Sequence, residues 1–216
     1  MSLSYTDTLG NIWNIDNQGN LYDARKTYQS GGSTYTQDTL DGTSLSLYVG
    51  GNTSRTYPTW QTPTVSGNTH TVTGTDTTTG ISITRKTYIA DGFVRVLEIV
   101  TNTGSAATTA RIDLTDDIYY DSYTQVSASS SGDTVRTTSD DWATYSSSSN
   151  TDYPRLTHIV SGGAGSPSAT SYINAYAEKP VTSFDLNLAA GQTKVIMHFY
   201  ALSNDTAGAT TIGNSL

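Results

Sequence analysis

Four aspartates lie close together in the middle of the chain, at Asp113, Asp116, Asp117 and Asp121. Calcium takes about six to eight hard oxygen ligands, and carboxylates from the end of a strand and the loop after it can supply several of them. This segment therefore makes calcium a candidate stabilising ion. A solvated acidic turn accounts for the same residues and stays open as the alternative.

A second group combines aromatic rings with carboxylates, because Trp142 follows Asp140 and Asp141, and Tyr145 comes three residues later. Aromatic faces carried by loops stack on sugar rings, while neighbouring carboxylates bind hydroxyl groups. The four residues therefore form a candidate glycan-binding patch. Tryptophan and tyrosine also pack at the ends of β-sandwiches, and that alternative stays open.

Acid–base chemistry would fall to the histidines His70, His158 and His198, with Glu178 as a candidate base. His198 lies in the apolar stretch at residues 194–202, a position that indicates a core or interface histidine. The chain has no cysteine, which excludes disulfides, thiol chemistry and cysteine-bound zinc. It also lacks a Gly-x-Ser-x-Gly nucleophile elbow and a phosphate-binding Gly-Lys loop. We therefore predict no catalytic residue.

Strands have to position these side chains, because helical periodicity is absent and glutamate occurs only at Glu98 and Glu178. Alternating or continuous apolar patterns, separated by Gly, Asn and Asp turns, predict strands at residues 11–15, 44–49, 81–89, 93–100, 109–114, 181–188 and 194–202. Between residues 127 and 168 the pattern weakens and indicates long loops or decorated hairpins. We predict an all-β, antiparallel β-sandwich with one domain at residues 4–202, and a polar tail or linker at residues 203–216.

Composition restricts the setting of such a domain. The net charge is -8 and the pI about 4.5, which argues against partners such as nucleic acid or anionic lipid. The 39 threonines and 27 serines, few lysines and absent cysteines are typical of exported bacterial proteins. No window of the sequence resembles a membrane span, so we predict no membrane insertion. We expect an extracellular or cell-surface location.

The stretch from Ile83 to Gly104 has a Tyr-containing strand, an Asp-Gly turn, Phe-Val-Arg, and an apolar strand ending in Thr-Asn-Thr-Gly. It resembles a module of large bacterial exoproteins, some of which are labelled haemolysin-type calcium-binding. Residues 140–142 and 188–199 fit the same module. This resemblance implies a galactose-mutarotase-like or immunoglobulin-like sandwich. True mutarotases resemble the chain more weakly: their sugar site pairs two histidines with a carboxylate base, and their histidine motifs are not matched here.

Together these observations predict a non-catalytic binding or spacer module of a larger secreted or cell-surface bacterial protein, with calcium as its candidate ion. Its expected partners are neighbouring domains of the same chain, and glycans or other cell-surface components. The alternative from a different functional class is a carbohydrate-binding module or a degenerate mutarotase-type carbohydrate-active domain.

Overall fold

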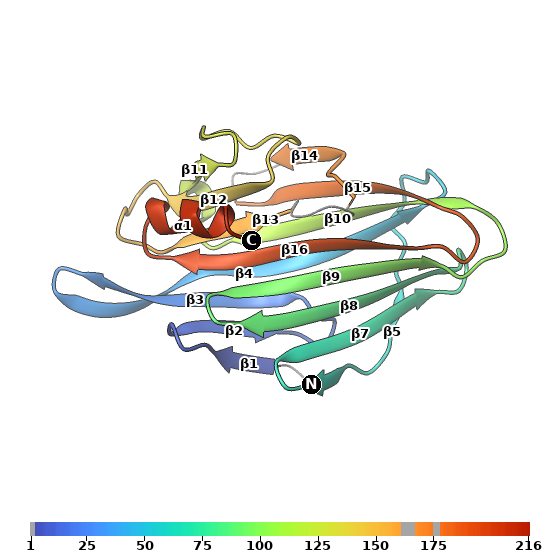
Figure 1. The fold of residues 1–216 in the computed structure, drawn as a ribbon, viewed down its shortest axis with the longest axis horizontal. Coiled ribbons are helices and arrows are strands. Elements are labelled where there is room, and N and C mark those ends of the chain that lie inside the picture. Colours follow the sequence, from blue (N-terminus) through green and yellow to red (C-terminus); the bar gives the residue numbers. More distant parts are fainter. Residues whose placement is uncertain (1–2, 161–166, 175–177) are drawn as a thin grey trace.

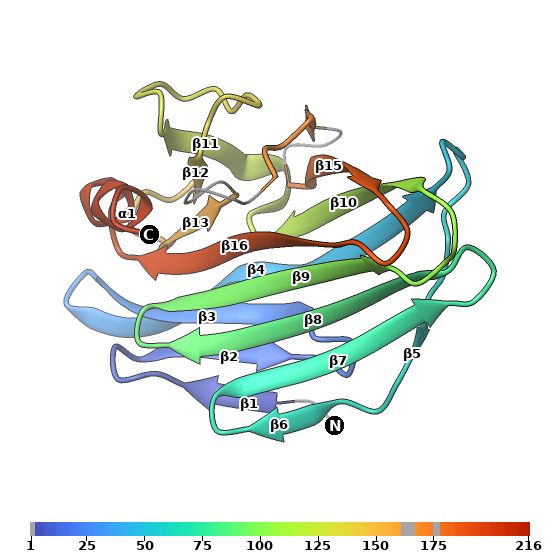
Figure 2. The same cartoon turned by 45° about the vertical axis from the view of Figure 1, so that its right-hand side comes forward.

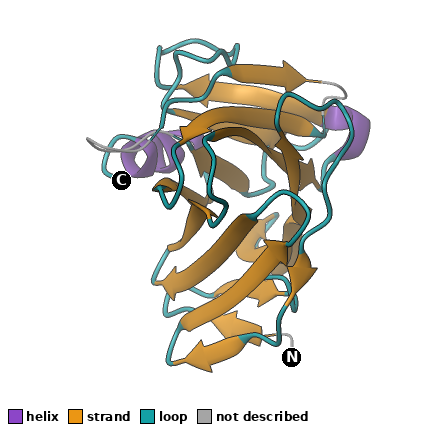
Figure 3. Ribbon diagram, turned by 90° about the vertical axis from the view of Figure 1, so that its right-hand side faces the viewer, coloured by secondary structure: helices purple, strands orange, loops and turns teal. Residues whose placement is uncertain are grey.

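The computed structural model describes residues 3–160, 167–174 and 178–216, which form two β-sheets packed face to face (Figure 1). Neighbouring strands pair antiparallel, so the predicted all-β antiparallel sandwich is confirmed. Besides strands, the described residues contain a short 3-10 turn (Asp121–Tyr123) and the helix α1 (Thr206–Gly213), both drawn in purple in Figure 3. No helix in this part of the chain is both long and apolar enough to cross a membrane.

Sheet A has seven strands. In spatial order they are β1 (Leu3–Thr6), β2 (Asn11–Ile15), β3 (Leu21–Ser30), β4 (Ser33–Val49), β10 (Thr108–Ile118), β15 (Pro180–Leu188) and β14 (Ser171–Asn174). Sheet B has nine strands. In order they are β11 (Thr124–Ser129), β12 (Trp142–Ser147), β13 (Arg155–Ile159), β16 (Thr193–Ser203), β9 (Phe93–Asn102), β8 (Ile81–Ala90), β7 (Thr69–Asp76) and β5 (Thr59–Trp60), with β6 (Thr64–Ser66) paired to β7. The chain between β4 and β5 crosses from sheet A to sheet B along one edge of the sandwich (Figure 2).

The core lies between the inner faces of the two sheets. Period-2 alternation places Val94, Val96 and Val100 of β9 on the inner face, where they are buried. The outer face of β9, with Leu97 and Ile99, is only partly buried. A continuous apolar run is typical of a strand that is covered on both faces, but in β9 only the inner face is fully buried.

A tight turn fastens sheet A to sheet B. Gly19, in the turn between β2 and β3, has φ +76°, and a Cβ at this position would lie 2.8 Å from Cδ of Arg85 on β8. The hydroxyl of Thr87, also on β8, donates to the Gly19 carbonyl. Glycine is therefore required here both for the left-handed backbone conformation and for the close approach of Arg85.

The stretch at residues 127–168, expected as loops or hairpins, supplies strands β12 and β13 and the end of β11. All side chains of β12 are buried although half of them are serine or threonine, since β12 lies between two strands and under α1. The predicted polar tail at residues 203–216 needs correction, because most of it is α1. Asp205 caps this helix by accepting from the Gly208 N–H at 2.7 Å. The helix ends on the indole of Trp142, which leaves no room for a Cβ at Gly213.

Candidate functional site

A hydrogen-bonded chain of polar side chains crosses the space between the sheets. His158 of β13 contacts Asp116 of β10 through Nδ1 and Oδ2 at 2.6 Å, and its Nε2 lies 3.1 Å from Nδ1 of His198 on β16. The Tyr200 hydroxyl donates to the other Asp116 oxygen at 2.7 Å. His158 and Tyr200 meet because they are cross-strand partners of β13 and β16, and their rings stack at 4.3 Å.

Beyond His198 lie two more buried polar side chains, Glu98 of β9 and Arg85 of β8, which are directly opposite each other on the paired strands. Nε of Arg85 donates to Oε1 of Glu98 at 2.7 Å, and its Nη1 donates to the Asn20 side chain and the Gln18 carbonyl. Glu98 Oε1 lies 3.7 Å from Nε2 of His198. We call Arg85, Glu98, Asp116, His158, His198 and Tyr200 the interior network.

The surroundings fix the charge of each group in this network. Burial alone would raise the pKa of Asp116, but His158, Tyr200 and Arg136 outweigh it and hold the pKa below its usual value. Burial would raise the pKa of Glu98, but the Arg85 cation outweighs this effect and holds the pKa below its usual value. Burial lowers the pKa of His158 to about 4 in spite of the neighbouring Asp116. At neutral pH the two carboxylates are therefore ionised and His158 is neutral.

A second buried cation, Arg136, enters from the loop before β12. It donates to the Tyr145 hydroxyl at 2.7 Å and to the Thr182 hydroxyl at 3.0 Å, and it lies 4.8 Å from the centre of the Tyr172 ring. Arg136 also contributes to the low pKa of Asp116. Arg85 and Arg136 therefore balance the charges of Glu98 and Asp116 in and beside the interior network.

The interior network is closed to solvent, because no side chain in it is more than 4% exposed. A cavity of about 10 Å³ lies beside Glu98 and His198. Such a volume has room for one water molecule, not for a sugar. Two histidines beside two carboxylates are chemically suited to proton transfer, but a substrate does not reach them in this conformation.

An open pocket of about 330 Å³ lies next to the interior network, at the edge where the chain crosses between the sheets. We call it the Trp60 pocket; it is lined by Gln18, Asn20, Ser44, Leu45, Arg55, Thr56, Tyr57, Pro58 and Trp60. Asn20 accepts a hydrogen bond from Arg85 and so links the pocket wall to the network. Ser44 lines both the pocket and the inner cavity.

Two aromatic rings border the Trp60 pocket. Tyr57 is 76% exposed, and the Arg55 guanidinium lies 5.8 Å from the centre of its ring. Trp60 packs on Gly74 of β7, where a Cβ would come within 2.7 Å of the indole. The missing side chain at Gly74 therefore allows Trp60 to lie flat against the strand. The pocket combines aromatic surface with amide, hydroxyl and guanidinium groups.

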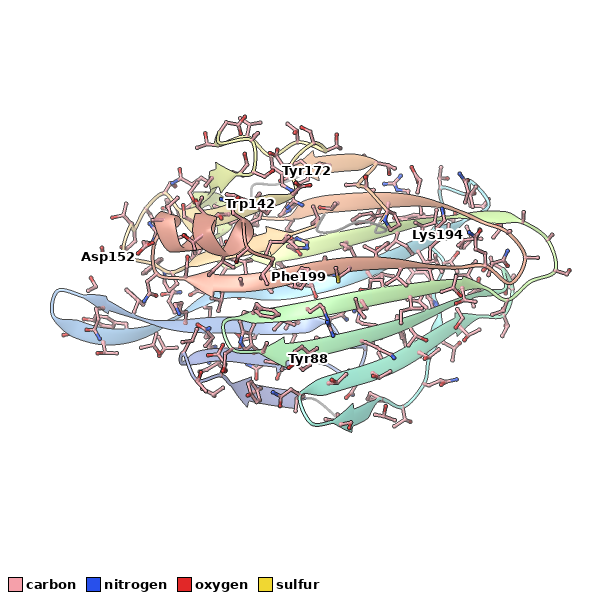
Figure 4. The ribbon with its side chains drawn as sticks, viewed as in Figure 1. Tyr88, Trp142, Asp152, Tyr172, Lys194 and Phe199 are labelled. Atoms are coloured by element: carbon pink, nitrogen blue, oxygen red, sulfur yellow. The ribbon has the colours of Figure 1, made fainter. Side chains whose placement is uncertain are left out.

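The structure separates the predicted glycan-binding residues. Trp142 is buried under α1 and donates from Nε1 to Asn214 at 3.2 Å (Figure 4). Tyr145, three residues along the same strand, faces the opposite side and contacts Arg136. Asp140 is buried and accepts from the backbone of Ser131 and Thr137, while Asp141 is exposed. These residues do not form a shared surface for a sugar, because Trp142 is covered by α1 and Tyr145 lies inside the sandwich.

The four predicted calcium ligands are also separated, because alternate residues of β10 point to opposite faces. Asp116 points inward to His158, whereas Asp113 is paired with Arg111 at 2.7 Å on the other face. Asp117 forms an ion pair with Lys179 at 3.0 Å. Asp121 is exposed in the loop after β10. Within the described residues, no group of three or more His, Cys, Asp or Glu side chains is arranged to hold a metal ion.

The three histidines have different surroundings. His158 and His198 meet in the interior network, whereas His70 lies on β7, buried and with its pKa lowered by burial. Glu178, the candidate base, lies in the turn before β15, and the carboxylate beside His198 is Glu98 instead. One sequence signal could have identified Glu98: it is the single charge on the inward parity of the apolar strand at residues 93–100.

Neither a protein-family model nor a curated protein matches this chain. Several solved structures do match it. A galactose mutarotase-like protein from Lactobacillus casei ATCC 334 superposes with a TM-score of 0.61 at 10% identity, over 94% of this chain and 100% of that protein. The Slr1438 protein from Synechocystis sp. PCC 6803 superposes with a TM-score of 0.59 at 7% identity, over 95% of this chain and 96% of that protein.

At such low identity the likeness concerns the fold alone. It decides between the two sandwich types that the sequence left open, because these structures align along nearly the whole length of both chains. The chain therefore has the galactose mutarotase-like β-sandwich fold.

Proposed function

We propose that this domain is a non-catalytic carbohydrate-binding module and that the Trp60 pocket is its glycan site. The observation that carries the proposal is the placement of Tyr57 and Trp60 on the border of an open pocket whose other walls supply amide and hydroxyl groups. Aromatic faces stack on the apolar faces of sugar rings, and the polar groups bind the hydroxyls and set the orientation.

The chemistry of the pocket favours a neutral glycan. Gln18, Ser44 and Thr56 offer uncharged donors and acceptors, and the protein carries a net charge of -8, which repels polyanionic chains. Arg55 adds one cation whose position over the Tyr57 ring orients its donors. Neutral oligosaccharides of cell walls or secreted polysaccharides are the class that fits.

The non-catalytic part of the proposal rests on the closure of the interior network. Its histidines and carboxylates have the groups that acid–base chemistry on a sugar needs, but Asn20, Gln18 and Arg85 separate them from the pocket. A degenerate mutarotase-type domain would have this combination of a retained fold and a sealed polar interior. As in the sequence analysis, we place the domain in a larger secreted or cell-surface bacterial protein of the exoprotein type.

A glycan array followed by calorimetric titration of the best neutral oligosaccharide tests this function. Tyr57→Ala is the informative variant, since a side chain that is 76% exposed can be removed without damage to the core. Tyr123→Ala is the matched control, because Tyr123 is 56% exposed and lies outside the pocket. We expect Tyr57→Ala to weaken binding at least tenfold and Tyr123→Ala to leave it unchanged. Equal affinities of both variants, or no binding across a broad array, would contradict the proposal.

Calcium remains part of this proposal, although the arrangement of the aspartates restricts where it could act. Burial raises the pKa of Asp41, and electrostatic repulsion from the nearby carboxylates of Asp117 and Asp121 raises it further. A calcium ion on that surface would relieve the repulsion. Melting curves in calcium and in chelator test it: a higher Tm in calcium that is lost in Asp121→Asn supports this location, and equal Tm values contradict it.

A further inference from the structure

The cavity beside His198 is bordered by two polar atoms that lack a hydrogen-bond partner in the protein. Its walls are Gly19, Thr43, Ser44, Arg85, Val96, Glu98, Leu114, His198 and Tyr200, and its volume is about 10 Å³. Oε2 of Glu98 and Nε2 of His198 are fully buried and unpartnered. Unpaired buried acceptors of this kind are costly, so a donor is required at this place.

The tautomers along the interior network show what kind of donor is needed. The ionised Asp116 carboxylate can only accept a hydrogen bond, so Nδ1 of His158 is protonated and donates to it. Nε2 of the neutral His158 is then an acceptor, and the proton between the rings belongs to Nδ1 of His198. Nε2 of a neutral His198 is therefore a lone pair. It faces Glu98 at 3.7 Å, and Glu98 is itself an acceptor from Arg85.

Charge balance argues against a proton on Nε2 of His198. The charged groups of the network around it are Glu98 of β9 and Arg85 of β8 on its own sheet and Asp116 of β10 on the opposite sheet. Arg136, in the loop before β12, acts on Asp116 and His158. These two cations and two anions already balance. A third cation in this closed interior would have no counter-charge.

We propose that the cavity binds one water molecule, which donates one proton to Nε2 of His198 and the other to Oε2 of Glu98. Thr43 lines the cavity, and its oxygen accepts from the Leu21 N–H at 3.1 Å, so its hydroxyl proton is available to the water as a third partner. Three partners are the usual number for a buried water. The water joins Asp116, His158, His198, Glu98 and Arg85 into one continuous network between the sheets.

Two measurements test this water site on the intact chain. Long-range ¹H–¹⁵N correlation spectra at pH 7 assign the ring nitrogens, and we expect both His158 and His198 as neutral Nδ1–H tautomers. A crystal structure at high resolution should contain one water within hydrogen-bond distance of His198 Nε2 and Glu98 Oε2. Imidazolium shifts for His198, or direct contact of His198 with Glu98 and no water between them, would overturn the proposal.

A cavity-filling variant gives an independent check. Val96 lines the cavity, so Val96→Ile adds one methyl group where the water would lie. Filling a dry cavity raises the urea midpoint of unfolding, whereas displacement of this water leaves two acceptors without a donor and lowers it. We expect a lower midpoint, and a higher one would contradict the water site.

Discussion

Nδ1 of His158 lies 2.6 Å from a carboxylate oxygen of Asp116, and this contact joins β13 of sheet B to β10 of sheet A. Both side chains are at most 1% exposed. The pKa values of both groups are lower than usual. At neutral pH Asp116 is therefore an ionised carboxylate that accepts a hydrogen bond from the neutral imidazole of His158. The contact is therefore a hydrogen bond between the sheets whose strength depends on pH.

The stability of the fold should decrease as the pH falls from 6.5 to 4. In this window the unfolded chain binds a proton at His158, whose ordinary pKa is 6.5, while the folded chain does not bind it until about pH 4. The contribution is fully present above pH 6.5, and the shift corresponds to about 3 kcal/mol at about 1.4 kcal/mol per unit. Below pH 4, Asp116 and Glu98 extend the loss, because their folded pKa values are depressed as well.

Urea unfolding at a series of pH values measures this loss. His70 has a lowered pKa and contributes in the same window, so the test compares the wild type with His158→Gln. We expect the variant to be less stable at pH 7 but to lose less of its stability between pH 6.5 and 4. Parallel curves for the two proteins would show that His158 is not the titrating group.

Removal of Arg85 should destabilise the fold strongly. Arg85→Met leaves the Glu98 carboxylate buried without its cation, and such unpaired charges cost about 3–5 kcal/mol. Arg85→Met combined with Glu98→Leu removes both charges, and we expect the free energy of unfolding to recover in large part. A double variant as unstable as Arg85→Met alone would mean that the pair contributes through packing rather than charge.

Period-2 alternation was enough to predict most of the central strands. Residues 81–89 and 93–100 form β8 and β9 much as expected, since Ile83, Val94 and Val96 point inward at regular intervals. Asp113 and Asp116 show the limit of the method. Proximity in sequence suggested one shared site, but residues an odd number apart on a strand face opposite sides.

Long-range contacts decided what the sequence could not predict. Trp142 resembled an exposed binding residue because its sequence neighbours are polar, and the helix that covers it lies about seventy residues later, as its bond to Asn214 shows. His158 and His198 lacked a recognisable motif, since strand pairing brings them together across a separation of 40 residues. Both arrangements depend on tertiary structure alone.

The contact between α1 and Trp142 should be important for stability rather than for binding. Trp142→Ala removes a buried indole, and such truncations cost about 3–5 kcal/mol. Gly213→Ala should destabilise as well, because its Cβ would lie 2.5 Å from the indole. Gly208→Ala in the same helix is the control and should stay within about 1 kcal/mol of the wild type. Thermal melts check this order, and equal effects of the two glycine variants would contradict the packing of α1 on Trp142.

A comparison of alanine variants at Gly19 and Gly10 separates the cost of crowding Arg85 on β8 from the cost of the left-handed backbone conformation. Both glycines have φ +76°. Each lies at the end of a turn, and its N–H donates to the carbonyl of an aspartate three residues earlier. A Cβ at Gly10 meets no atom within 4 Å, whereas one at Gly19 lies 2.8 Å from Cδ of Arg85. Gly10→Ala should therefore cost only the left-handed conformation, about 1–2 kcal/mol.

Gly19→Ala should cost distinctly more than Gly10→Ala, because Arg85 has to move and its bonds to Asn20 and Glu98 weaken with it. Chemical denaturation of the two variants gives the difference directly. The Nε resonance of Arg85 should shift in Gly19→Ala and stay in place in Gly10→Ala. If both variants lose the same free energy, the turn does not press on Arg85, and the link between the Trp60 pocket wall and the interior network is weaker than the contacts indicate.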